Sequence, residues 1–210
     1  RIKENETLLK FQDMIADMPM ERLILTDDVI SYAINVENLK LSQNIYLTLV
    51  DHINFAIERF KEGMTPENAL MWEIKRFYPQ EYALGLYTIR LIHDRMGLLL
   101  PDSEAGFIAL HFVNAQYSTH MKETLSLPHL MRDIMDIVMS ELNVNLNENS
   151  IHYERFVTHI KFLIQRLYHN EMLLDEDTIF EDMMKEKYPR EFECGKRIAK
   201  YIEHETKSEI

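Results

Sequence analysis

The sequence contains little of what several protein classes need. It has a single cysteine, Cys194, so no disulfide can form within the chain, and a reducing compartment is the simplest assumption. Only five glycines and six prolines occur in 210 residues, too few for the many turns of an all-β fold. Helix-forming residues are plentiful, including thirteen methionines. The sequence therefore predicts an all-α protein.

Long apolar runs and basic excess are also lacking. No run approaches the roughly 18 apolar residues of a membrane span, and the opening "RIKENETLLK" has no signal-peptide core. We therefore expect a cytoplasmic protein with no membrane insertion. The net charge is −12, and both halves of the chain carry more acidic than basic residues. Because nucleic-acid binding depends on basic patches, direct DNA or RNA binding by this segment is not expected. A first residue other than Met suggests part of a longer polypeptide.

The common motifs of enzyme chemistry are missing as well. The sequence has no HExxH, no Glu-x-x-His, no G-x-S-x-G and no glycine-rich nucleotide loop, and one cysteine cannot build a zinc cluster. Cys194 itself lies in a charged helical segment. We expect no metal site, no cofactor and no enzymatic activity.

Apolar residues recur at spacings of three and four through most of the chain, which is typical of amphipathic helices. Start signals are Thr65 with Pro66, Asp102 or Ser103 ahead of Glu104, and Asp175. The pattern predicts helices near residues 4–17, 27–38, 43–62, 66–77, 80–96, 104–117, 128–142, 149–169, 176–187 and 190–206.

A polar stretch, "YSTHMKETLSLP", interrupts the helical pattern and marks a domain boundary. We expect a lead-in helix or linker over 1–22, a first domain over 23–118, a linker over 119–127 and a second domain over 128–210. Each domain should be a compact helical bundle of about five helices.

The two predicted domains share an internal repeat. "LVDHINFAIERF" aligns with "FVTHIKFLIQRL", which pairs His52 with His159 and Arg59 with Arg166. After a three-residue insertion, "YPQEY" aligns with "YPREF". The chain therefore reads as a tandem duplication. The counterpart of His111 would fall beyond the last residue, so we expect the second bundle to lack its last helix.

The repeated histidines allow two interpretations. His52, His111 and His159 each lie among apolar neighbours, where a histidine is most often a hydrogen-bonded core or interface residue. The repetition of a histidine together with an arginine favours a chemical role instead. Seven residues of helix span about 10.5 Å, so His52 and Arg59 mark one face without necessarily touching. An imidazole can accept a phosphoryl group, and the resulting dianion favours a nearby guanidinium.

Three motifs in order carry a family resemblance: "LVDHINFAIERF", "IKRFYPQEYALG" and "LPDSEAGFIALHFVNAQ". Together with the second copy, they closely resemble the tandem PTS regulation domains of BglG/LicT-type transcriptional antiterminators. The resemblance implies reversible histidine phosphorylation by the sugar phosphotransferase system, with His52 and His111 as acceptors in the first domain and His159 in the second. We take four further residues as supporting these acceptors: Asp51, Arg59, Glu104 and Arg166.

The resemblance also implies partners and an output. The first domain would be phosphorylated under the control of a sugar-specific enzyme II, which inhibits, and the second by the phosphocarrier HPr, which activates. Phosphorylation would control homodimerisation, and through it RNA binding by an N-terminal domain that is not in this sequence. Two alternatives remain: the same domains in a DNA-binding activator, or a purely structural helical dimerisation module whose histidines belong to the core.

Overall fold

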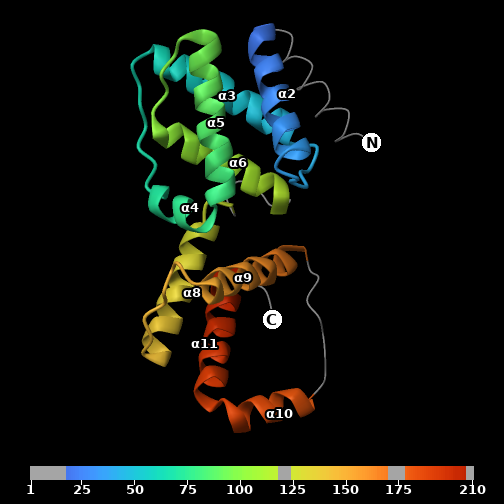
Figure 1. Cartoon of the computed structure of the whole chain (residues 1–210), viewed down its shortest axis with the longest axis vertical. Helices are drawn as coiled ribbons and strands as arrows, with labels where there is room; N and C mark the ends of the chain where they lie inside the picture. The colour runs from blue at the N-terminus through green and yellow to red at the C-terminus, as the bar shows by residue number, and fades with distance from the viewer. Residues whose placement is uncertain (1–17, 118–123, 170–177, 207–210) are drawn as a thin grey trace. The chain divides into compact units, whose positions relative to one another are not determined.

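The computed structural model describes residues 18–117, 124–169 and 178–206. Within these ranges it contains nine α-helices and no strand (Figure 1), so the all-α prediction is confirmed. The helix predicted over 4–17 and the helix start predicted at Asp175 lie outside the described residues. The helices are α2 (Met20–Asn35), α3 (Ile45–Lys61), α4 (Met71–Phe77), α5 (Pro79–Met96), α6 (Asp102–Tyr117), α8 (Leu127–Leu142), α9 (Ile151–His169), α10 (Thr178–Lys187) and α11 (Pro189–Thr206).

The chain divides into two compact units, Arg1–Thr124 and Leu125–Ile210. In the first unit, α2 packs against α3 and α5, and α6 packs against α3, α4 and α5 (Figure 1). A large apolar core joins α2, α3, α5 and α6, and a smaller cluster lies between α4 and α6. The fully buried side chains of the large core include Leu25, Ile30, Leu49, Ile53 and Phe112.

Helix α6 is buried on nearly every side, unlike the amphipathic helices around it. Its backbone comes very close to α5 at Gly85, where an added Cβ would lie only 2.1 Å from the carbonyl oxygen of Ala105. Only glycine permits this approach, because any side chain would overlap the α6 backbone. The small residues at this crossing, Gly85 and Ala105, therefore allow α6 to pack in the middle of the first unit.

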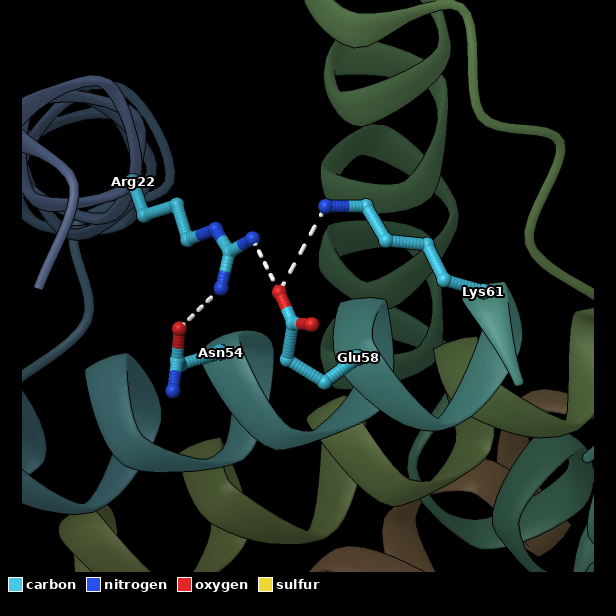
Figure 2. A network of polar contacts seen from close by, with 4 residues as sticks. All are labelled: Arg22, Asn54, Glu58 and Lys61. Carbon is cyan, nitrogen blue, oxygen red and sulfur yellow. Dashed lines mark hydrogen bonds and ion pairs between the residues drawn. The ribbon is translucent and has the colours of Figure 1, made fainter.

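A polar network joins α2 to α3 (Figure 2). The buried guanidinium of Arg22 donates hydrogen bonds to Asn54 and Glu58, and Lys61 Nζ lies 3.4 Å from the same Glu58 oxygen. The interaction with Arg22 lowers the pKa of Glu58. Because Arg22 starts from the first turn of α2 and reaches two residues one turn apart on α3, the network sets how the two helices align.

The sequence analysis placed the start of α2 too late. The helix begins at Met20, directly after Pro19, and not near residue 27. The pair Asp27–Asp28 therefore lies in the helix interior, where Asp28 pairs with Arg95 of α5 at 2.7 Å.

A second boundary was also wrong. The predicted helix over 66–77, with Thr65 as its cap, begins only at Met71. Residues 64–68 have no regular structure, and the Asn68 side chain accepts a hydrogen bond from the Leu70 backbone N–H at 2.9 Å. Asn68 is buried next to Gly106 of α6, where an added Cβ would lie 2.8 Å from its Nδ2. This tertiary contact keeps the segment out of the helix despite its start signal.

The second unit contains α8, α9, α10 and α11 among its described residues. Its core is formed by α8, α9 and α11, and α9 contributes apolar residues at the spacing of one helical face: Tyr153, Val157, Ile160, Ile164 and Leu167. Helix α11 is tied to α8 by Tyr201, whose hydroxyl donates to Asp133 at 2.5 Å. It is also tied by Arg190, which donates to the carbonyl of Leu142 at the end of α8 at 2.9 Å.

The glycine contact in the first unit can be tested against its repeat partner. Gly85→Ala should lower the free energy of unfolding of the first unit by about 1–3 kcal/mol, because the new methyl group must push α6 away from α5. Trp72, the only tryptophan, lies in this unit and reports its urea unfolding by fluorescence.

The matched control is Gly195→Ala in the second unit. Apart from its chain neighbours and the backbone of its own helix turn, no described atom lies within 4 Å of a Cβ built at Gly195, and the residue is exposed within α11. This substitution should raise helix stability by about 0.5–1 kcal/mol, as alanine does in an open helix position. Equal effects of the two substitutions would contradict the packing assigned to Gly85.

Candidate functional site

Two pairs of side chains face each other where α3 meets α6. His52 and Arg59 come from α3, and Glu104 and His111 come from α6, and the members of each pair are seven positions apart in the sequence. The ring centroids of His52 and His111 lie 4.6 Å apart, and Arg59 Nη2 lies 2.6 Å from Glu104 Oε1. Because two turns of helix separate the members of each pair, α3 and α6 run in opposite directions along this contact. We call these four residues the histidine cluster.

Glu104 links the two ends of the histidine cluster. One carboxylate oxygen accepts the hydrogen bond from Arg59, and the other, Oε2, lies 3.5 Å from His52 Nε2. Its side chain is only 2% exposed, compared with 14% for His52 and 17% for Arg59. His52 and Arg59, which the sequence placed on one face, are thus connected through a residue of another helix.

The protonation of Glu104 follows from its neighbours. Burial by itself would raise the pKa of the carboxyl group, but the interactions with His52 and Arg59 outweigh burial and lower that pKa. The carboxylate is therefore ionised at neutral pH. The cluster therefore contains a buried negative charge 3.5 Å from His52 Nε2.

His111 has the opposite protonation behaviour. Burial, with a smaller contribution from nearby His52, lowers the pKa of His111 from 6.5 to about 3. The ring is therefore neutral at physiological pH, and a neutral imidazole keeps a nitrogen lone pair for use as a base or nucleophile.

Four buried polar atoms of the histidine cluster make no hydrogen bond with the described residues: His52 Nε2, Arg59 Nε, Glu104 Oε2 and His111 Nδ1. The separation of 3.5 Å between His52 and Glu104 is too long for a good hydrogen bond. An unpaired buried polar group costs about 1–3 kcal/mol, so such a concentration is unusual for a site that serves only packing.

Aromatic side chains border the cluster. The Arg59 guanidinium lies 4.8 Å from the ring centre of Phe55, one turn earlier on α3, in a cation–π arrangement. Phe107 lies beside His52, with ring centroids 6.2 Å apart. Phe55 is 57% exposed, so it holds the arginine at the edge of the protein rather than in the core. Phe55 was not among the predicted site residues, although its repetition as Phe162 is a signal for such a role.

The remaining predicted site residues are not in the cluster. Asp51 is exposed on α3 and makes no hydrogen bond or ion pair with the described residues. His159 and Arg166 lie on α9 of the second unit, where both are exposed and neither pairs with a described residue. No described atom lies within 4 Å of a Cβ built at Gly195, the repeat counterpart of Gly85. The described part of the second unit thus lacks the helix contact that encloses His52.

The described residues form neither a metal site nor a membrane span. Within residues 18–117, 124–169 and 178–206, no three His, Cys, Asp or Glu side chains are arranged to hold a metal ion. None of the helices in these ranges has the length and apolar character needed to cross a bilayer.

Comparison with known proteins assigns a family to this pair of helical units. The PRD domain model matches the chain twice, over residues 27–115 and 132–210. The chain belongs to the PRD domain family. The chain is 41% identical over 201 residues to transcription antiterminator LicT of Bacillus subtilis, covering 96% of this chain and 73% of that protein. It is 39% identical over 201 residues to the beta-glucoside operon antiterminator of Dickeya chrysanthemi, covering 96% of this chain and 71% of that protein.

These matches make the chain a regulatory PRD region of the BglG/LicT antiterminator type. The two matched PRD domains correspond to the two copies of the internal repeat. Among solved structures, the crystal structure of GlcT CAT-PRDI is similar, with a TM-score of 0.48 and 35% identity, covering 50% of this chain and 63% of that chain.

The low pKa of His111 predicts a pH effect on the first PRD domain. The folded His111 takes up its proton only near pH 3, whereas the unfolded residue takes it up near 6.5. Between these values the unfolded state binds more protons, so stability must fall as pH drops from about 6.5. Urea unfolding followed by Trp72 fluorescence at pH 7.5, 6 and 5 measures this loss, which a single proton limits to about 1.4 kcal/mol per pH unit.

His111→Gln should remove most of this pH dependence between pH 7 and 5. His93→Gln is the control, since His93 lies in the same unit but its side chain is 52% exposed. An unchanged slope in the His111 variant would contradict the buried, neutral state assigned to this ring.

Proposed function

We propose that this PRD region is reversibly phosphorylated on histidine by proteins of the sugar phosphotransferase system. His52 and His111 would be the acceptors of the first domain and His159 an acceptor of the second. Phosphorylation would control homodimerisation, and hence RNA binding by an N-terminal domain that is not in this sequence. The region itself would act in the cytoplasm as a regulator rather than an enzyme, without a metal or other cofactor.

The observation that carries this proposal is the histidine cluster of the first domain. Two imidazole rings lie 4.6 Å apart, the low pKa of His111 keeps that ring neutral, and a guanidinium is held in the same cluster. A neutral ring nitrogen can attack phosphorus, and a guanidinium can pair with the oxygens of the group it accepts. A packing role alone would be served by apolar side chains, without unpaired polar atoms in the core.

The transfer step needs only a phosphohistidine donor. A ring nitrogen of the acceptor forms the new nitrogen–phosphorus bond while the corresponding bond in the donor breaks. The electron pair of the broken bond returns to the donor ring nitrogen, and the acceptor ring keeps its proton on the other nitrogen. The product carries up to two negative charges in a partly buried site, which is enough to change how helices or subunits pack.

The donors that fit this proposal are HPr and a sugar-specific enzyme II. The names of the relatives support the regulatory setting, since LicT is a transcription antiterminator and the Dickeya chrysanthemi protein is an antiterminator of a beta-glucoside operon. His159 is exposed in the described structure, so a protein donor could reach it without rearrangement of α9. Arg166 on the same helix would support it, as Arg59 supports His52.

Labelling tests the proposal directly. The chain, incubated with phosphoenolpyruvate, enzyme I, HPr and the cognate enzyme II, should gain acid-labile phosphate on His52, His111 and His159, located by mass spectrometry under alkaline conditions. The oligomeric state, measured by light scattering before and after labelling, should change. Replacing the three histidines together with glutamine should abolish both effects.

His93→Gln and His152→Gln serve as controls, because both histidines are exposed and lie outside the cluster. These variants should label as the unmodified chain does, and circular dichroism establishes that every variant is folded. Label that persists in the triple variant, or an oligomeric state that labelling does not alter, would contradict the proposal. The second result would remove only its dimerisation part.

A further inference from the structure

Glu104 occupies an unusual position for a carboxylate. It lies in the first turn of α6, is 2% exposed and joins the guanidinium of Arg59 to the edge of the His52 ring. It is also ionised, since its neighbours lower its pKa in spite of burial. A proposed phosphate acceptor thus has a buried negative charge 3.5 Å from its Nε2.

This arrangement opposes phosphorylation of His52 as it stands. A phosphoryl group on either ring nitrogen would bring up to two further negative charges next to the carboxylate, in a site with little solvent to screen them. The same group would need the guanidinium that Glu104 already holds. One of the two anions must therefore give up Arg59.

We propose that Glu104 is a placeholder for the phosphoryl group: it holds Arg59 at the cluster until His52 is phosphorylated and is then displaced. This inference rests on the phosphorylation proposed above and adds the residue that sets the energy of the modified state. The negative charge of Glu104 makes phospho-His52 less stable, and its departure frees Arg59 to pair with the new group.

The unpaired atoms of the cluster support the exchange. Arg59 uses Nη2 on Glu104 while its buried Nε has no hydrogen-bond partner among the described residues, so an incoming anion can begin to pair with the guanidinium before Glu104 leaves. The Phe55 ring centre lies 4.8 Å from the guanidinium, and this contact does not involve Glu104. Arg59 can therefore stay in place while its partner changes.

The exchange also couples phosphorylation of His52 to the packing of α6. Glu104 belongs to α6, which packs against α3, α4 and α5, so its release loosens the first turn of the helix at the centre of the domain. Asp102, in the same turn, is exposed and makes no comparable contact. Glu104 thus links the charge on His52 to the packing of α6 in the first domain.

The test is the equilibrium of phosphoryl transfer from phospho-HPr to His52, reached in the presence of the cognate enzyme II. The full chain is mixed with stoichiometric ³²P-labelled phospho-HPr and a catalytic amount of enzyme II, and the phosphorylated fraction of His52 is measured by peptide mass spectrometry under alkaline conditions. Glu104→Gln keeps the shape of the side chain and removes its charge. It should shift the transfer equilibrium roughly tenfold towards phospho-His52, as expected for one nearby like charge.

Two further variants distinguish the effect of the Glu104 charge from the effect of side-chain shape and from the effect of the domain's net charge. Glu104→Asp keeps the negative charge and should stay within about twofold of the unmodified chain, which a merely structural role of the glutamate would not predict. Glu58→Gln removes an equal charge from the same domain, from a carboxylate that pairs with Arg22 outside the cluster, and should also stay within about twofold.

Three outcomes would overturn the placeholder role of Glu104, and they differ in what they imply for phosphorylation. Equal equilibria for Glu104→Gln and the unmodified chain overturn the placeholder while leaving histidine phosphorylation intact. A similar gain in Glu58→Gln also overturns it, because the effect would then come from net charge. Absence of label on His52 in every variant, including treatment with phosphoramidate as a small donor, overturns both the placeholder and phosphorylation of His52.

Discussion

The first PRD domain depends on the close seating of α6 among α3, α4 and α5. The contact of Gly85 with the Ala105 carbonyl brings the α6 backbone against α5, while another side of α6 packs against α3. Glu104 and His111 face Arg59 and His52 only because of that placement. Since the core is packed at high density, a displacement of α6 cannot be absorbed locally. The same constraint that makes the fold compact therefore makes the histidine cluster sensitive to the position of a single helix.

Much of the fold could be read from the sequence, because amphipathic spacing and the internal repeat are local patterns. The all-α class and most of the helices, for instance α5 and α8, follow directly from them. The start of α4 could not be predicted, since Asn68 is held by α6, far away in sequence. The predicted helix over 27–38 began too late, because α2 starts at Met20, within the stretch assigned to the lead-in segment. The start of α4, by contrast, shows a tertiary contact that overrides a local signal.

In the candidate site, too, the features that are local in the sequence could be predicted and the tertiary contacts could not. Repetition placed His52 and Arg59 on one face, and helical spacing does show that seven residues span two turns. Spacing alone could not show that Glu104 joins them, because that contact depends on how α3 and α6 cross. Nor could it separate the two copies: His52 is enclosed by α6, whereas His159, in the repeated motif, is exposed in the described structure. Identical residues therefore have different chemistry when different neighbours cover them.

Charge bears on how the proposed phosphorylation would act in an acidic protein. With a net charge of −12, an added phosphate would meet general repulsion, so an acceptor site would need a fixed cation close by. Arg59 is such a cation, and its pairing with Glu104 avoids the cost of an unpaired charge in a nearly buried site. Under the proposal, this pairing stabilises the unmodified state and, for the same reason, raises the energy of the phosphorylated one. A single covalent charge would then be able to change how the helices pack.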